Sequence, residues 1–250
     1  MNELRIIPLP FAEEILPGDS LLGKILAALS SARQRFRSGD ILVVKHKIVS
    51  KAEGQLVALA DIKPSLATNR WARRYKLDPR VTQLALRESK RVLRQKNGVL
   101  ITETGHGLIC ANSAVDVSNV DGGRHALLLP KDPDRSAARL HRQLKKRTGL
   151  HIPVMITDTF GRPWREGLME VAIGVAGMRA LHDDRGKRDP HGYRLRVTME
   201  AVADELACTA GLVCGKLGRT PACIIRGFQY QRGGSSARDL IRPAKKDLFR

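Results

Sequence analysis

Short runs of branched or long aliphatic residues, each bounded by turn-forming residues, recur along the chain. Runs of this kind are typical of strands that are buried in a sheet. All of them are far shorter than the roughly 20 apolar residues that a membrane-spanning helix needs. The segments that we predict as strands are residues 41–44, 99–102, 108–111, 126–129, 152–157, 171–175 and 222–225.

Between these runs, apolar residues recur at the spacing of helices with one buried face. We predict helices over residues 20–36, 64–77, 79–93, 132–148 and 195–214, and a charged, glycine-rich excursion over residues 185–192. Asp19 or Ser20 can cap the first helix, while Pro133 and Gly149 mark the two ends of the fourth. The pattern predicts a mixed α/β (α+β) fold. Because 250 residues with 42% hydrophobic content can bury a large core and no linker divides them, we expect residues 1–250 to form a single domain.

The formal net charge of +19, from 44 Lys and Arg against 25 Asp and Glu, predicts a positive field that attracts polyanions. The basic residues are spread out and mixed with acids, and aromatic residues make up only 4%, too few for base-stacking platforms. We therefore expect phosphorylated small molecules rather than nucleic acid, with an RNA-binding module as the non-enzyme alternative. The four cysteines form no C-x-x-C pair and no secretory segment is present, so we expect a cytoplasmic protein with no membrane partner.

Two acidic segments follow predicted strands and are the strongest candidates for a functional site. Asp116 lies in a predicted loop over residues 110–119, and Asp158 with Thr159 ends a buried strand. The chain then opens into a predicted loop over residues 160–167, which carries Arg162 and Arg165. Hard divalent cations bind carboxylate and hydroxyl oxygens and leave positions for phosphate oxygens. The structural alternative is that the two aspartates cap turns.

A second set of residues could bind phosphates or a nucleotide. Lys47 and Lys51 are four residues apart and could face one phosphate chain, although solvated lysines often show this spacing. His46 is either a core histidine or a nucleotide contact, and Asn119 can hold a base or ribose or close an Asx turn. The loop over residues 215–218 offers backbone amides to an anion, or simply a helix C-cap at its glycine. Neither a G-x-x-x-x-G-K-[ST] loop nor a G-x-G-x-x-G turn after a strand is present.

These segments also match a known family over nearly the whole chain from Pro17 onward. The matching words are residues 39–44, 46–54, 87–89, 110–112 with Asp116, 118–119, 158–167, 172–177, 204–206 and 237–243, and the run 158–167 is the most specific of them. Together they resemble the coenzyme F-420 gamma-glutamyl ligases, enzymes that add glutamate to a deazaflavin coenzyme. The chain departs from the family pattern at Gly105, at Ser113-Ala114, and at Leu168 and Glu170.

The resemblance implies a homodimer with a single mixed α/β domain particular to the family. It also implies that the protein uses GTP with two divalent ions, manganese or magnesium, and it leaves room for a potassium ion. The implied metal ligands are Asp116, Asp158 and Thr159. The implied nucleotide-binding residues are Glu14, Ile15, His46, Lys47, Lys51, Asn119, Gly215, Lys216 and Gly218.

The activity implied by the resemblance is the GTP-dependent joining of L-glutamate to the phospholactyl carboxylate of coenzyme F-420-0, through an acyl phosphate, with release of GDP and phosphate. Further gamma-linked glutamates could follow. We expect Asp116, Asp158 and Lys47 to stabilise charge on the phosphates. Arg165, with Arg162, is our candidate for gripping an acceptor carboxylate or phosphodiester. The alternative from another enzyme class is a metal-dependent phosphate-ester hydrolase, since the same residue types can serve attack by water.

Overall fold

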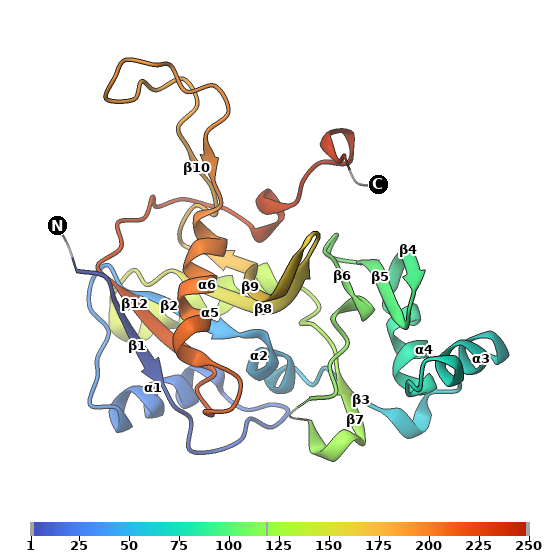
Figure 1. Ribbon diagram of the computed structural model, residues 1–250. Coiled ribbons are helices and arrows are strands. Elements are labelled where there is room, and N and C mark those ends of the chain that lie inside the picture. Colours follow the sequence, from blue (N-terminus) through green and yellow to red (C-terminus); the bar gives the residue numbers. More distant parts are fainter. Residues whose placement is uncertain (1–2, 119, 249–250) are drawn as a thin grey trace.

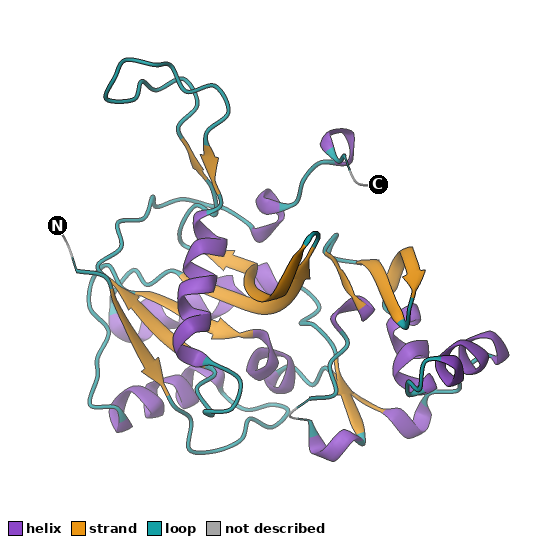
Figure 2. Cartoon of the chain, in the orientation of Figure 1, coloured by secondary structure: helices purple, strands orange, loops and turns teal. Residues whose placement is uncertain are grey.

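The computed structural model describes residues 3–118 and 120–248, and within them a five-stranded mixed sheet occupies the centre (Figures 1 and 2). Its strand order is β1-β12-β2-β8-β9. The β2 and β8 strands are parallel, and the other neighbours are antiparallel. The strands are β1 (Arg5–Leu9), β2 (Ile41–Lys45), β8 (Val154–Arg162), β9 (Arg165–Ala176) and β12 (Ala222–Arg226). The mixed α/β prediction is confirmed, although the sequence pattern missed β1.

Helices cover both faces of this sheet, and the side chains of β2 show why. Leu42 and Val44 pack into the core on the face of α1 and α5, whereas Ile41 and Val43 pack against α6 on the other face. Because successive side chains of a strand point to opposite faces, a run of four aliphatic residues suits a strand buried on both sides. The helices are α1 (Leu21–Ser31), α2 (His46–Ala52), α5 (Pro133–Thr148) and α6 (Val202–Cys214).

The ends of α5 follow the signals in the sequence. The Asp132 side chain accepts a hydrogen bond from the backbone N–H of Arg135 at 3.0 Å, and Pro133 occupies the first turn. At the other end Gly149 adopts a left-handed φ of 74° and terminates the helix. The helix predicted over residues 132–148 is therefore confirmed.

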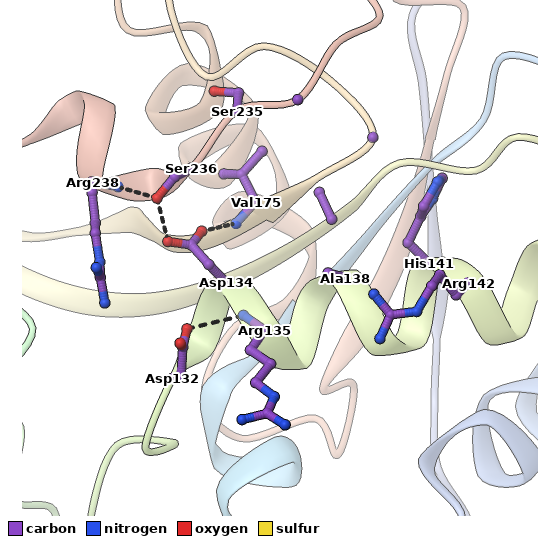
Figure 3. Close-up of a pocket in the computed structure, with 13 residues that line it drawn as sticks. Asp132, Asp134, Arg135, Ala138, His141, Arg142, Val175, Ser235, Ser236 and Arg238 are labelled. Carbon is purple, nitrogen blue, oxygen red and sulfur yellow. Dashed lines mark hydrogen bonds between the residues drawn. The ribbon is translucent and has the colours of Figure 1, made fainter.

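Asp134 in the first turn of α5 ties the closing segment of the chain to the sheet (Figure 3). Its carboxylate accepts from the backbone N–H groups of Val175 and Ala237, both at 2.9 Å, and from the Ser236 hydroxyl at 2.5 Å. A cavity of about 450 Å³ opens beside these contacts and is bordered by the exposed arginines Arg135, Arg142 and Arg238. The C-terminal segment is thus attached by one partly buried network of hydrogen bonds.

A smaller part of the fold packs beside the sheet around the buried side chains of Leu59, Ile62, Leu84 and Ala126. In it β3 pairs with β7, and β5 pairs with both β4 and β6. Its elements are β3 (Leu56–Ala58), α3 (Leu66–Arg74), α4 (Pro79–Arg87), β4 (Ser89–Lys96), β5 (Val99–Thr104), β6 (Ile109–Ala111) and β7 (His125–Leu127). The chain also contains single helical turns at η1 (Leu59–Asp61), η2 (Asn112–Ala114), η3 (Asp121–Gly123), η4 (Ala237–Leu240) and η5 (Ala244–Lys246).

The helix predicted over residues 79–93 is wrong in its second half. The α4 helix ends at Arg87, and the chain continues as β4, which is antiparallel to β5. Cross-strand pairing replaces the helix, with Arg91 opposite Glu103 and a 2.8 Å ion pair between them. Such pairs are the stabilising unit of a sheet and outweigh the weak helical preference of a mostly polar segment.

The loop predicted over residues 160–167 is also wrong. The β8 and β9 strands continue past the end of β2 as a two-stranded ribbon, in which Thr159 lies opposite Glu170 and Arg162 lies opposite Arg165. A tight turn joins them, with Trp164 at a φ of 57°. The antiparallel ladder satisfies the backbone groups of this segment, so that glycine and arginine residues that resemble a loop lie in strands instead.

The excursion predicted over residues 185–192 is confirmed as the tip of an arm that projects from the body between β10 (His182–Asp183) and β11 (Met199–Glu200) (Figure 1). Residues 195–201 form its returning side, so α6 begins later than the predicted start at residue 195. The predicted strands at residues 41–44, 99–102, 108–111, 126–129, 152–157, 171–175 and 222–225 all overlap observed strands. Across the described residues, no helix has the length and apolar character needed to cross a membrane.

Candidate functional site

A cavity of about 790 Å³ opens at the carboxyl ends of the parallel strands β2 and β8. In sheets with parallel strands, this edge is a common position for ligand binding. Five separate parts of the chain contribute to its wall: the segment after β1, the end of β2 with the start of α2, residues 116–117 with 120–123, residues 157–159 of β8, and the segment that joins α6 to β12. The predicted site residues that line it are Glu14, Ile15, His46, Lys47, Lys51, Asp116, Asp158, Thr159, Gly215 and Lys216.

Two lysines of α2 reach the cavity from one face of the helix, because residues four apart lie one above the other. The Lys47 ammonium lies 2.7 Å from Asp116 Oδ2 and donates to the Ser118 hydroxyl at 2.8 Å. The Lys51 ammonium lies 2.5 Å from Glu14 Oε1. Both cations are therefore held at the cavity by acidic residues from other parts of the chain.

The Asp116 carboxylate is partly buried and accepts from the backbone N–H of Ser118 at 2.7 Å. Burial alone would raise its pKa, but the hydrogen bonds from Lys47 and Ser118 outweigh burial and hold the pKa of Asp116 below its usual range. Asp116 is therefore ionised at neutral pH and available to a cation.

Asp158 lies in the wall of the cavity beside His46. The His46 ring is 2% exposed, and its Nε2 lies 3.2 Å from Asp158 Oδ1. This contact lacks hydrogen-bond geometry, so Nε2 is a buried polar atom without a hydrogen-bond partner among the described residues. The Cys110 thiol interacts electrostatically with this carboxylate. Burial, the larger cause, and the nearby Asp158, the smaller one, raise the pKa of Cys110 to about 12. Asp158 is thus a largely buried carboxylate that lies beside the buried His46 ring and borders the cavity.

Thr159 connects the cavity to a buried ion pair that the sequence analysis did not identify as part of the site. Its hydroxyl donates to Glu170 Oε1 at 2.7 Å, and the same oxygen pairs with the ammonium of Lys45. Lys45 lines the cavity, and Glu170 lies directly opposite Thr159 across the β8–β9 ladder. The available signal was the position of Glu170, an acid between the apolar residues Met169 and Val171 of a strand. Using this signal requires the register of the strand to be known.

These donors fit a hard divalent cation that shares its coordination with phosphate. Two carboxylates, Asp116 and Asp158, and the Thr159 hydroxyl border the same cavity, and unpartnered buried polar atoms lie beside them. Among the described residues, no group of three or more His, Cys, Asp or Glu side chains is arranged to hold a metal by itself. Magnesium-type sites commonly use one or two carboxylates and take the remaining ligands from phosphates and water.

Other predicted residues lie differently. Arg162 and Arg165 are at the tip of the β8–β9 ribbon and do not belong to the cavity wall, so the assigned role of Arg165 stays a prediction. Gly218 lies within the segment that joins α6 to β12 but is not one of the lining residues. Gly215, at a φ of 54°, is both the C-cap of α6 and part of the wall. Asn119 lies outside the described residues.

Comparisons with known proteins show the family to which the chain is similar. A family profile described as "F420-0:Gamma-glutamyl ligase" matches residues 11–227. A protein of Methanopyrus kandleri named coenzyme F420:L-glutamate ligase is 42% identical over 99% of this chain and 98% of its own length. Proteins with the same name from Methanothermobacter thermautotrophicus and Methanocaldococcus jannaschii are 43% and 41% identical, over 93% and 88% of this chain and the same shares of their own lengths. Their extent and identity confirm the predicted ligase, and the chain belongs to the F420-0:gamma-glutamyl ligase family.

Proposed function

We propose that this protein is a GTP-dependent ligase that joins L-glutamate to the phospholactyl carboxylate of coenzyme F-420-0. The observation that carries the proposal is that Lys47, Asp116, Asp158 and Thr159, from three distant segments, border one cavity at the end of β2 and β8. The names of the relatives support glutamate and the deazaflavin coenzyme as substrates. The paired lysines and carboxylates support a nucleotide triphosphate as the source of energy.

The reaction needs an activated carboxylate because amide formation is unfavourable in water. A carboxylate oxygen of the acceptor attacks the γ-phosphorus of GTP, and the bond to the bridging oxygen of GDP breaks. The amine of glutamate then attacks the acyl carbon, phosphate leaves, and the nitrogen loses a proton. The protein's task in the first step is to position two anions and to stabilise the charge on the transferred phosphoryl group.

Asp116, Asp158 and Thr159 would hold manganese or magnesium, which supplies Lewis-acid stabilisation of the phosphate charge when bound. The Lys47 ammonium now lies against Asp116 Oδ2. A cation bound at this carboxylate would compete with Lys47 for it, so we infer that Lys47 would then turn from Asp116 to the phosphates. Lys51, held by Glu14 at the same wall, would bind the nucleotide beside it. The acidic partners thus keep both lysines in place before substrate arrives.

The acceptor would reach the cavity along the β8–β9 ribbon. Arg162 and Arg165 face each other across the ladder at its tip, where their planar guanidinium groups suit a carboxylate or phosphodiester. Alanine at Arg165 is expected to raise the KM for the acceptor more than the KM for GTP. Unchanged acceptor kinetics would refute this role.

The decisive experiment incubates the purified protein with coenzyme F-420-0, GTP, Mn²⁺ and L-glutamate and follows the coenzyme by mass spectrometry. We expect glutamyl addition that requires GTP and metal and that is abolished in Asp158→Asn. Asp183→Asn, at an exposed ion pair of the arm, is the matched control and should retain activity. Phosphate release without glutamate or acceptor would contradict the proposal and favour a phosphate-ester hydrolase.

We also infer that the protein is a homodimer. The projecting arm supports this, because a two-stranded hairpin is marginally stable by itself, yet this arm is internally hydrogen bonded and exposes Tyr193 and Val197. Light scattering is expected to give about twice the chain mass of 27.6 kDa. A monomer mass at micromolar concentration would contradict the inference.

A further inference from the structure

Glu170 lies behind the cavity wall and is held more firmly than a surface carboxylate would be. Its side chain is 7% exposed, and one carboxylate oxygen takes both the Lys45 ammonium and the Thr159 hydroxyl. The α6 helix passes so closely that a Cβ atom on Gly211 would lie 2.5 Å from Glu170 Cγ. The second oxygen, Oε2, has no hydrogen-bond partner among the described residues. The fold therefore makes room for a buried acid at this position, with a glycine in the facing helix.

Stability alone does not account for such an arrangement. A buried ion pair costs desolvation energy that roughly cancels its attraction, and apolar residues of similar volume often stabilise a protein as well or better. The neighbouring residues of β9 are apolar and would form a continuous core with such a replacement: Val171, Ala172 and Ile173 all belong to the hydrophobic clusters. The presence of a glutamate at position 170 is therefore better explained by the groups that its side chain contacts than by stability.

The contact with Thr159 has a direct chemical consequence. A threonine hydroxyl has one proton to donate and two lone pairs. Because the proton is used in the 2.7 Å bond to Glu170, the hydroxyl can offer only lone pairs to the cavity. A divalent cation needs a lone pair of the hydroxyl oxygen to point toward it. A freely rotating hydroxyl points a lone pair toward the cation for only part of the time. Groups that orient metal ligands in this way commonly change metal affinity by 10- to 100-fold.

We propose that Glu170, fixed by Lys45, is a positioning residue that orients the hydroxyl of Thr159 toward a metal ion in the cavity. The inference rests on the proposed function to the extent that it assigns a divalent ion to this wall. The proposal adds that the Thr159 hydroxyl is oriented as an oxygen ligand only while Glu170 accepts its hydrogen bond. Glu170 itself is not one of the residues that line the cavity.

The test measures Mn²⁺ binding in the presence of GDP by the electron paramagnetic resonance signal of free Mn²⁺, which does not depend on turnover. The variant Lys45→Met/Glu170→Leu removes both charges together, so the net charge of the site is unchanged. We expect it to weaken Mn²⁺ binding about tenfold or more. In a Thr159→Val background, where no hydroxyl remains to orient, the same pair of substitutions should change affinity by less than about twofold.

Glu103→Gln is the matched control, because it removes another buried, ion-paired carboxylate from a strand of the smaller part of the fold. It is expected to leave Mn²⁺ affinity unchanged. If the double variant does not fold, as judged by thermal unfolding, Glu170→Gln keeps the volume of the side chain and is measured in both backgrounds instead. Glu170→Gln is likewise expected to weaken Mn²⁺ binding when Thr159 is present and to change it little in the Thr159→Val background.

Unchanged Mn²⁺ affinity after loss of the pair, an equal loss in the Thr159→Val background, or a wild-type protein that binds no Mn²⁺ would each overturn the inference. Failure of glutamyl transfer is a separate result. If the wild type transfers no glutamate but binds Mn²⁺ with the expected dependence on Glu170 and Thr159, the proposed ligase function fails while the positioning role of Glu170 stands.

Discussion

A single methyl group on the face of α6 that packs against Glu170 should disturb the site without replacing any polar atom in it. In Gly211→Ala the added Cβ would lie 2.5 Å from Glu170 Cγ and 3.5 Å from its Cβ. Carbon atoms pack at about 3.5–4.0 Å, so the Glu170 side chain must withdraw by about 1 Å. Its hydrogen bond to Thr159 now measures 2.7 Å. A shift of about 1 Å would carry it past the limit of about 3.5 Å beyond which such a contact is no longer a hydrogen bond.

The effect on stability is expected to be small because two terms oppose each other. Replacing glycine by alanine within a helix gains about 1 kcal/mol, and overpacking a buried contact costs about 1–3 kcal/mol. The net loss is then about 0–2 kcal/mol, which corresponds to a Tm lower by up to about 8 °C for a chain of this size. Mn²⁺ affinity should fall more sharply than stability, by about tenfold.

Thermal unfolding and the Mn²⁺ titration with GDP check this pair of outcomes. Gly23→Ala in α1 is the control, since its Cβ would meet only the Ser20 side chain, at 3.3 Å or more, and should leave Mn²⁺ binding unchanged. A Gly211→Ala protein that is more stable than the wild type and binds Mn²⁺ equally well would refute the reasoning, because it would mean that Glu170 can move without consequence.

Three further predictions follow from buried and titrating groups. Asp40→Ala leaves the Arg226 guanidinium without the fully buried carboxylate that pairs with it at 2.7 Å, and should cost about 3–5 kcal/mol in urea unfolding; a loss below about 1 kcal/mol would contradict this. The pKa of Asp116 is held low by hydrogen bonds that include one from Lys47. The ionised Asp116 therefore stabilises the folded protein fully above the ordinary carboxyl pKa near 3.9, and this stabilisation is lost as the pH falls through the lower pKa that Asp116 has in the folded protein. Unfolding measured across pH should therefore show Lys47→Met destabilised near neutral pH, with the difference from wild type closing below about pH 4; a difference that persists in acid would contradict it. Since burial raises the pKa of Cys110 to about 12, its alkylation by iodoacetamide should be slow at pH 8 and rise about tenfold per pH unit, and a plateau near pH 9 would argue against that assignment.

The fold was predictable where each segment carried its own signal. Four aliphatic residues from Ile41 to Val44 predict a strand that is buried on both faces, and Asp132, Pro133 and Gly149 mark a helix with both ends capped. The errors occur where a distant partner decides the structure. β4 is a strand because β5 lies beside it, and the predicted arginine loop is a ribbon because β8 and β9 pair beyond the sheet. A local pattern holds no information about such a partner.

The candidate site shows the same division. Asp116, Asp158 and the α2 lysines stand out because polar residues directly follow strands, and the structure places them on one cavity. Lys45 and Glu170 were missed, although they join that wall through an ion pair. Their contact depends on the register between β8 and β9 and on the approach of α6, both of which arise only when the chain is folded. Sequence motifs thus identify residues that line a cavity more readily than they identify the residues that support them, such as Glu170.

The position of β12 constrains when the molecule can form during its synthesis. β1 is an edge strand that pairs with β12, and β12 in turn separates it from β2. β1 is therefore made long before its partner β12, and β2 lacks a neighbour on one side for just as long. Because the segment that joins α6 to β12 also supplies part of the cavity wall, a growing chain has no finished cavity until this segment has been made. The cavity should therefore be completed in a single late step, once β12 can pair with both of its neighbours.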